Sequence, residues 1–331
     1  MIKYVLKRLL MIIPVLLCVA IVIFTVMYFA PGDPIYLILG ESYTPEQYAE
    51  WAARLGLDKS YIEQLLTFLK DIFLKFDFGT SYIMRTDIKA ELFARLPRTA
   101  IIAAVCCALQ VVIAIPLGIT AATHQNGLVD RFCILLAMIG ISLPGFWVGM
   151  ILILVFAVYI PILPASGIDH WYCYILPCVA NALMGVGSLT RMTRSQMLEV
   201  IRSDYVVTAR AKGVPERTIL YSHALPNALI PIVTFVGTHF GRALGGTVVI
   251  ETLFAIPGVG LYITQGVDNR DYPIVRAGVT LLALLFCLVV LAVDILYAFI
   301  DPRIKAQYEG SGRKKVKKNT KKAEKGVAAN V

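Results

Sequence analysis

Residues 204–231 read DYVVTARAKGVPERTILYSHALPNALIP, a polar and basic stretch between two long apolar runs. Ser203 or Asp204 can cap a helix that runs to Lys212, and Gly213 can end that helix in the left-handed conformation. The first half of the stretch therefore predicts a short helix that stops at a sharp glycine corner.

The second half of the stretch predicts another helix after the corner. Pro215 suits the first turn of a helix, and Glu216 then lies near its positive end. Pro226 is expected to terminate this second helix at the membrane edge. A rigid helix–turn–helix of this kind transmits a push from a docked partner, whereas a flexible loop absorbs it.

Six apolar runs around this hairpin define the class of the protein. The chain is 58% hydrophobic and 16% charged, with a mean hydropathy of +0.73, whereas soluble domains have about 25% charged residues. Each run approaches or exceeds the roughly 20 residues that cross a bilayer, and backbone groups in lipid must be paired within the segment. The sequence therefore predicts an all-α polytopic membrane protein with six transmembrane helices. The predicted spans are Leu9–Phe29, Thr99–Ala122, Phe132–Tyr159, Tyr172–Leu189, Asn227–Leu253 and Ile274–Ile300.

The placement of lysine and arginine predicts the orientation of these spans. The segment 31–98 carries eight basic and ten acidic residues, and the loop 159–172 has no lysine or arginine. In contrast, the segment 191–222 has six basic and three acidic residues, and residues 303–331 have ten basic and two acidic ones. Both termini, the short loop 124–131 and the hairpin are therefore expected to face the cytoplasm.

The basic tail accounts for most of the net charge of +9. It lacks apolar periodicity and is expected to be disordered. Its lysines either contact the anionic lipids of the inner leaflet or form a solvated end that reinforces topology. Nucleic-acid binding is not expected, because no aromatic residues are interleaved with the lysines.

Motifs for chemistry are missing from the sequence. It contains no G-x-x-x-x-G-K-[ST] phosphate loop, no Ser/His/Asp arrangement, and no cysteine spacing that suits zinc. The histidines are scattered, so no metal site is predicted; they are His124, His170, His223 and His239. The chain is therefore not expected to be an enzyme, and energy must come from another polypeptide or from an ion gradient.

The segment after the first span is predicted to be helical. Thr44 precedes a proline and is followed three residues later by a glutamine, and Ser60 is followed in the same way by Glu63. Both patterns are capping boxes. The second helix has one apolar face and is expected to pack as a lid over the bundle, with Asp77-Phe78-Gly79 closing it at a glycine stop.

Several short motifs then occur in a fixed order. The stretch VTARAKG, residues 207–213, is followed by His223-Ala224-Leu225-Pro226 and resembles the EAA loop of ABC-importer permeases. The other motifs are Lys7-Arg8-Leu9-Leu10, Pro31-Gly32-Asp33-Pro34, Leu55-Gly56-Leu57-Asp58, Phe78-Gly79-Thr80-Ser81, Arg95-Leu96-Pro97-Arg98-Thr99, Ser142-Leu143-Pro144, Phe254-Ala255-Ile256-Pro257-Gly258-Val259-Gly260, Arg270-Asp271-Tyr272-Pro273 and Asp301-Pro302-Arg303. Over about residues 1–305 the chain resembles the dipeptide/oligopeptide/nickel branch of that family. It is most similar to the first, B-type, of the two permease subunits. It departs from the general motif at Val207, Thr208 and His223.

The resemblance implies a type I ABC-importer permease fold and a function in importing di- or oligopeptides, with nickel or metallophore complexes as an alternative. It also implies a second homologous permease, two cytoplasmic ABC ATPases and an extracytoplasmic substrate-binding protein as partners, in a bacterial cell membrane. ATP and magnesium would then be held by the ATPases, and this chain would need no cofactor. A gradient-driven transporter or channel acting alone is the rival from another class, and a scaffold without transport is a weaker one.

The expected division of the chain follows from these observations. Residues 1–30 form the leader and first span, residues 31–98 the outer helical segment, and residues 99–302 the permease core. The core contains the coupling hairpin 191–226, and residues 303–331 form the tail.

The hairpin is implied to sit in a groove of the ATPase. The residues expected to couple the two proteins are Thr208, Ala209, Arg210, Lys212, Gly213, Glu216, Leu225 and Pro226.

Candidate residues for the translocation path lie in the fifth span. Arg242 lies there with His239 and Glu251, and a charge at that depth costs several kcal/mol unless it is paired or faces water. Arg242 therefore either meets a negative group of the cargo or pairs with an acid of a neighbouring helix or subunit. Four glycines, at 237, 241, 245 and 246, either permit close helix packing or leave room for cargo. Asp294 of the sixth span is expected to fix a helix contact.

A polar outer loop completes the candidates. Asp268, Asn269, Arg270 and Asp271 either contact the substrate-binding protein or form a plain solvated turn.

Overall fold

The computed structural model describes residues 2–40 and 43–300, and every regular element within these ranges is helical. The predicted all-helical class is confirmed. The tail 303–331, with its expected disorder, lies outside the described residues.

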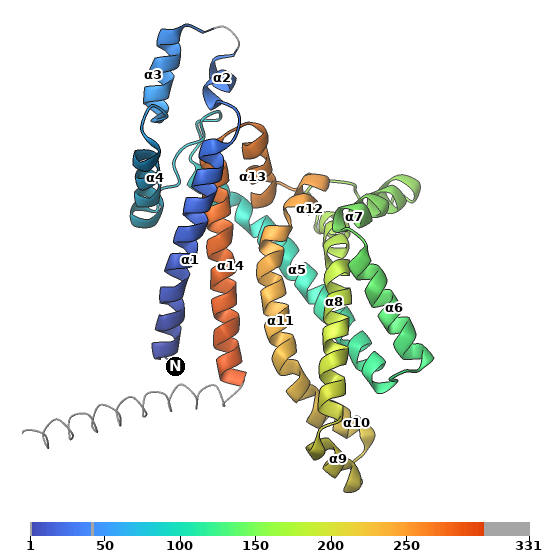
Figure 1. Cartoon of the computed structure of the whole chain (residues 1–331). Coiled ribbons are helices and arrows are strands. Elements are labelled where there is room, and N and C mark those ends of the chain that lie inside the picture. Colours follow the sequence, from blue (N-terminus) through green and yellow to red (C-terminus); the bar gives the residue numbers. More distant parts are fainter. Residues whose placement is uncertain (1, 41–42, 301–331) are drawn as a thin grey trace, which may run out of the picture.

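Five helical segments of the described chain are long and apolar enough to cross a bilayer. They run side by side in Figure 1 and form the body of the protein. Their helices are α1 (Ile2–Phe29), α5 (Ile88–Thr123), α8 (Ile175–Ile201), α11 (Leu225–Gly246) and α14 (Tyr272–Ile300).

The third predicted span is bent rather than straight. It consists of α6 (Leu128–Ser142) and α7 (Gly145–Ile153), which continues as a π-helical turn over Leu154–Tyr159, and the two parts meet at 94°. The predicted span 132–159 is therefore not one continuous helix, because Pro144 forces the preceding Leu143 into extended conformation and cannot donate to a helical ladder. Counting the bent pair as one span brings the total to the six that were predicted.

The fifth predicted span also differs at both ends. It begins inside a continuous helical path, from α10 (Glu216–Thr218) through a π-helical turn over Ile219–Ala224 into α11. The expectation that Pro226 ends a helix is wrong, because Pro226 occupies the first turn of α11, where its missing N–H leaves no bond unmade. At the other end α11 stops at two glycines, and α12 (Val248–Leu253) is a separate helix.

The outer segment contains three short helices, α2 (Pro34–Leu39), α3 (Pro45–Leu55) and α4 (Tyr61–Lys70). Both predicted capping boxes are formed, one at the start of α3 and one at the start of α4. A π-helical turn over Asp71–Lys75 extends α4 and ends at Phe76, whose φ is 55°. The helical path therefore ends three residues before the predicted glycine stop.

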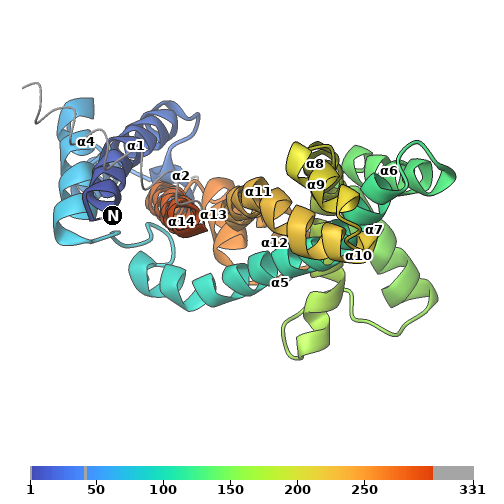
Figure 2. The ribbon, with the colours of Figure 1, turned by 90° about the horizontal axis from the view of Figure 1, so that it is seen from below.

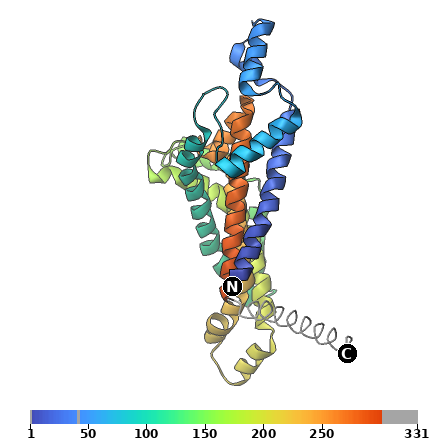
Figure 3. The ribbon, with the colours of Figure 1, turned by 90° about the vertical axis from the view of Figure 1, so that its left-hand side faces the viewer.

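The helix α4 packs beside α1, at the outer end of the bundle (Figure 3). The ring of Phe24 lies 5.7 Å from that of Tyr61 and 5.5 Å from that of Phe68, centroid to centroid. The hydroxyl groups of Thr25 and Tyr61 are 2.8 Å apart. These contacts fix the outer segment to the first span.

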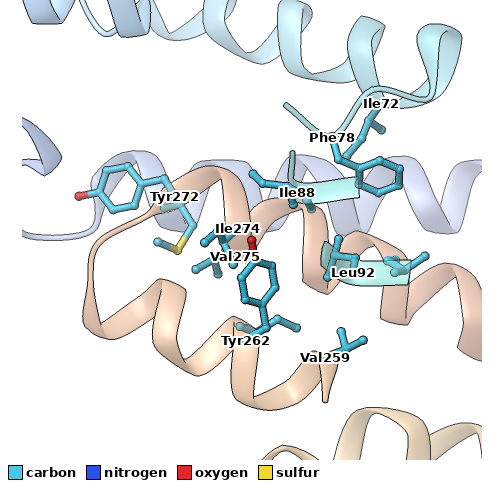
Figure 4. Close-up of a cluster of buried hydrophobic side chains, with 13 residues drawn as sticks. Ile72, Phe78, Ile88, Leu92, Val259, Tyr262, Tyr272, Ile274 and Val275 are labelled. Carbon is cyan, nitrogen blue, oxygen red and sulfur yellow. The ribbon is translucent and has the colours of Figure 1, made fainter. Parts of the chain in front are cut away.

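A buried apolar cluster joins this outer segment to α5, to α13 (Val259–Asp268) and to the start of α14. Figure 4 shows Leu92 of α5, Val259 and Tyr262 of α13, and Ile274 of α14 at its centre. Each fully buried side chain of this size contributes about 1.5–3 kcal/mol. The cluster makes the outer end of the molecule a rigid platform.

Viewed from below in Figure 2, α1, α4 and α14 gather at one side and α6 and α8 at the other, with α5 and α11 between them. Glycines bring α11 close to α14: a Cβ added at Gly237 would lie 2.0 Å from a methyl group of Val293, and one at Gly241 would lie 3.0 Å from the ring of Phe286. These glycines were expected either to permit close helix packing or to leave room for cargo. Gly237 and Gly241 permit close packing of α11 against α14.

The first and last spans are joined by an ion pair. A guanidinium nitrogen of Arg8 in α1 lies 2.7 Å from a carboxylate oxygen of Asp294 in α14. The expectation that Asp294 fixes a helix contact is confirmed.

Candidate functional site

The polar stretch around residue 210 forms a hairpin that projects from the end of the bundle at which α1 begins (Figures 1 and 3). Its first arm is α9 (Asp204–Ala211), and its second arm is α10 with the π-helical turn that follows. The segment 191–201, which was assigned to the hairpin, instead continues α8. The projecting part is therefore shorter than predicted.

Backbone hydrogen bonds define the corner between the arms. Gly213 has a φ of 77°, its amide donates to the carbonyl of Arg210 at 2.9 Å, and the amide of Val214 donates to that of Ala209 at 3.2 Å. These bonds satisfy carbonyl groups that the end of α9 would otherwise leave unpaired. The predicted left-handed glycine is confirmed.

The start of α9 differs in detail from the prediction. Ser203 stands at the N-cap position in extended conformation, but its hydroxyl donates to the carbonyl of Val200 at 2.6 Å instead of capping. Asp204 lies in the first turn, where its negative charge is favourable near the helix N-terminus.

An ion pair braces the corner. Arg210 donates two hydrogen bonds to the carboxylate of Glu216, at 3.0 Å from Nε and 2.6 Å from Nη2. The hydrogen bonds to Glu216 raise the pKa of the Arg210 guanidinium, so the pair is charged at any physiological pH. The two side chains are 41% and 54% exposed, so the ion pair lies on the surface and adds little to the stability of the fold. Its two hydrogen bonds instead fix the orientation of the two side chains across the corner.

The arms are anchored to the bundle on their inner side. Val206 of α9 and Ile219 of the second arm are fully buried. The side-chain amide of Asn227 donates to the hydroxyl of Tyr205 at 3.0 Å and to the carbonyl of His223 at 2.9 Å. These contacts attach the hairpin to the start of α11.

The predicted coupling residues divide by exposure. Thr208, Arg210, Lys212, Gly213 and Glu216 are exposed around the corner. Ala209 is half-buried on the inner side of α9. Leu225 is also half-buried, at the start of α11, and Pro226 next to it is exposed. The structure thus brings five of the eight together at the tip and places Leu225 and Pro226 at the base.

A second feature is a cavity of about 840 Å³ between α6, α8 and α11. Basic side chains dominate its wall: Arg131, Arg191, Arg194 and Arg242 line it with a single acid, Asp130. That acid is occupied, because both of its oxygens accept hydrogen bonds from Arg194 at 2.7 Å. The cavity therefore carries an excess of positive charge.

Two of the residues predicted for the translocation path lie in this wall. Arg242 and His239 both line the cavity, and the ring of His239 lies 4.4 Å from that of Phe235, centroid to centroid. Among the described residues no carboxylate forms an ion pair with Arg242. A structural pair within this chain is thereby excluded for the described part, and a negative group from cargo or from another subunit remains.

Glu251, the third predicted residue, lies elsewhere and is fully buried. Its carboxylate accepts hydrogen bonds from the hydroxyl of Thr99 at 2.6 Å, from that of Thr247 at 3.0 Å and from the amide of Leu261 at 2.9 Å. The expectation that Glu251 lines a path is corrected, because the side chain joins α5, α12 and α13.

The four residues of the polar outer loop differ in their exposure. Asp268, Asn269 and Arg270 are exposed, whereas Asp271 is only 1% exposed. The carboxylate of Asp271 accepts hydrogen bonds from the hydroxyl of Ser81 at 2.5 Å and from two backbone amides of the outer segment. Asp271 is therefore not available to a partner, which corrects its prediction as a contact residue.

Two features of the site were not predicted from the sequence. Arg210 and Glu216 were both named, but not as a pair; opposite charges six residues apart across a glycine turn are the signal. The Asp130–Arg194 pair was not found, because the two residues are 64 positions apart and only the packing of α6 on α8 brings them together.

Comparison with known proteins shows extensive similarity. The sequence model of the family described as "Binding-protein-dependent transport system inner membrane component" matches residues 114–306, and the model of the corresponding N-terminal region matches residues 1–103.

Relatives match along nearly their whole length. The chain is 37% identical to the dipeptide transport system permease protein DppB of Alkalihalophilus pseudofirmus, over 92% of this chain and 100% of that one. It is 40% identical to the glutathione transport system permease protein GsiC of Salmonella typhimurium, over 92% and 99% of the two chains. The GsiC protein of Escherichia coli K12 is 38% identical with the same coverage.

A solved structure shares the fold. A chain of the MetNI methionine ABC transporter in an inward-facing conformation superposes with a TM-score of 0.56 and 19% identity, over 63% of this chain and 96% of that one.

Proposed function

The chain belongs to the family of binding-protein-dependent transport system inner membrane components, and from that premise we propose that it is a permease subunit of an ATP-driven peptide importer. It is a multi-pass protein of the bacterial inner membrane. Relatives that span its length are named for transport of dipeptides and of glutathione, itself a short peptide, which supports peptides as the cargo.

The build of the hairpin is the observation that supports coupling to an ATPase. The projecting hairpin has a fixed glycine corner, an ion pair across that corner and a buried inner face. An element with these properties moves as a unit and passes a displacement into α11. Two cytoplasmic ATPases bound at this corner would drive the permease between its conformations, provided that ATP binding stabilises one conformation over the other.

The orientation of the chain follows from the same proposal. The hairpin and the start of α1 lie at one end of the bundle, and the outer segment lies at the opposite end (Figure 1). The excess of basic residues in the segment 191–222 supports a cytoplasmic location for the hairpin end. The exposed residues Asp268, Asn269 and Arg270 then face the substrate-binding protein, and a second homologous permease completes the path.

The basic cavity supports a path beside α11. We assign Arg242 to the contact with the negative group of a peptide, because it lines the cavity without a carboxylate partner among the described residues. Arg242→Gln should slow uptake and leave assembly intact. Loss of assembly in this variant would show a structural role instead, and unchanged uptake would contradict the contact with cargo.

Two measurements test the function as a whole. First, the chain should co-purify with an ATPase. Second, uptake of a labelled dipeptide into proteoliposomes should require ATP on the side of the membrane to which the hairpin projects. Uptake that continues after ATP is depleted, while an ion gradient is maintained, would instead support a gradient-driven transporter.

A further inference from the structure

A pocket of about 670 Å³ opens at the outer end of the molecule, away from the basic cavity beside α11. Its walls come from α3 and α4, from the loop of residues 77–85, and from the first turns of α14. This volume lies within the range of about 300–1,000 Å³ that is usual for small-molecule sites.

The floor of the pocket contains a buried cation. Arg276 of α14 lines the pocket and is only 9% exposed. Its guanidinium carbon lies 4.8 Å from the ring centroid of Phe24, 5.9 Å from that of Phe68 and 6.0 Å from that of Tyr272. Three aromatic rings therefore hold the guanidinium in place and remove it from water.

The charge of this arginine is not balanced by an acid of the described chain. Within residues 2–40 and 43–300 no carboxylate forms an ion pair with Arg276, and its Nε has no hydrogen-bond partner. Among the described residues, the polar side chains that interact with the guanidinium are the phenols of Tyr82 and Tyr272. A buried cation with an unused donor is costly, and an anion in the adjoining pocket would remove that cost.

The rim of the pocket adds positive charge and an aromatic wall. The guanidinium groups of Arg54 and Arg85 lie 5.3 Å and 5.1 Å from the ring centroid of Trp51. Of the two acids in the wall, Asp71 pairs with Lys75 at 2.7 Å and Asp77 accepts a hydrogen bond from a backbone amide. Neither acid pairs with the buried arginine.

We propose that this pocket binds the carboxylate of a short peptide, with Arg276 as the buried counter-ion and Trp51 as the aromatic wall beside the peptide. The proposal rests on peptide import as the proposed function. A peptide fits better than a lipid because the wall mixes aromatic rings with four basic side chains and the polar loop 77–85, whereas acyl chains need a continuous apolar surface. The charge-assisted, two-point bond that an arginine offers suits a carboxylate.

The test uses the full chain in nanodiscs of phosphatidylcholine and the probe Ala-Phe, compared with its C-terminal amide. The free acid should bind at least tenfold more tightly than the amide, and Arg276→Gln should remove this difference. Arg54→Gln, on the exposed rim, should weaken binding of the acid about threefold without affecting folding. Lys70→Gln serves as the control, since Lys70 is exposed at the end of α4 and does not line the pocket, so its replacement should leave both affinities unchanged.

Equal binding of acid and amide to the unaltered chain would overturn the proposal, as would full affinity in the Arg276→Gln and Arg54→Gln variants. Binding of Ala-Phe that disappears when phosphatidylglycerol replaces part of the phosphatidylcholine would identify the headgroup of an anionic lipid as the anion and would also overturn it. Uptake of Ala-Phe by the assembled importer is measured in parallel. Normal ATP-dependent uptake without binding in the nanodiscs refutes the pocket alone, whereas uptake that needs no ATP refutes the proposed function.

Discussion

Replacing Gly213 by alanine tests whether the corner of the hairpin must keep its shape. Gly213 has a φ of 77°, and a Cβ added there would have no heavy atom within 4 Å. The substitution therefore introduces no steric clash with other parts of the chain. Its whole effect should come from the backbone conformation.

The size of that effect can be worked out. An L-residue in the left-handed conformation costs about 1–2 kcal/mol, and the lower entropy of the unfolded chain with alanine offsets about 0.4–1 kcal/mol of this. A net cost of about 1 kcal/mol changes a two-state population about fivefold. Gly213→Asn should cost less, because asparagine tolerates the left-handed region.

Two assays follow the substitution. Hydrogen exchange should show the amides of α9 about fivefold less protected in Gly213→Ala, and peptide-stimulated ATP hydrolysis by the reconstituted importer should fall. Gly40→Ala is the control, because Gly40 has a φ of 78° and equally open surroundings but ends α2 in the outer segment, outside the pocket of Arg276.

Two outcomes would refute this reasoning. Coupling that is unchanged in Gly213→Ala, despite weaker protection of α9, would show that the corner is not the coupling element. An equal loss of coupling in Gly40→Ala would show that the assay reports general destabilisation.

Three further predictions concern other contacts. Arg210→Glu and Glu216→Arg should each loosen the corner by about 0.2–1 kcal/mol, the usual value of an exposed pair; the double variant should restore α9 exchange protection, and failure to restore it would contradict the brace. Thr99→Val leaves the buried carboxylate of Glu251 without one donor and should destabilise the detergent-solubilised protein by about 1–3 kcal/mol, measured by thermal unfolding; an unchanged melting temperature would contradict it. Hydrogen bonds from the capping Ser60 lower the pKa of Glu63 from its ordinary value. The contribution of Glu63 to α4 is therefore complete above the ordinary pKa and is lost as the pH falls through the lowered one. Hydrogen exchange at α4 that does not respond to pH, after correction for intrinsic rates, would disagree.

Much of the fold follows from local rules. The capping boxes of α3 and α4 and the left-handed Gly213 formed as predicted, because each depends on residues within a few positions of one another. Apolar runs of bilayer length were sufficient to find the spans.

The differences come from effects that a hydropathy pattern does not contain. The bend at Pro144 lies within an uninterrupted apolar run, and Pro226 begins a helix that it was expected to end. In both cases the position of the proline relative to the helical ladder decides the outcome, and composition does not reveal it.

Of the candidate site, the sequence predicted the parts that depend on neighbouring residues and not those that depend on distant ones. The tip of the hairpin is local in sequence and was found, whereas Glu251 and Asp271 were assigned to a path and to a docking surface from their charge alone. Their partners Thr99 and Ser81 lie 152 and 190 residues away. Only the tertiary structure shows that both acids are already satisfied inside the protein.

The proposed function requires that a separate ATPase binds the exposed corner of the hairpin. The most direct measurement places a photo-cross-linking amino acid at Lys212 in the assembled importer, with the same group at Lys59 of the outer segment as a control. We expect a cross-link from Lys212 to the ATPase whose yield changes when ATP is bound, and none from Lys59. A corner that forms no cross-link during active transport would contradict it.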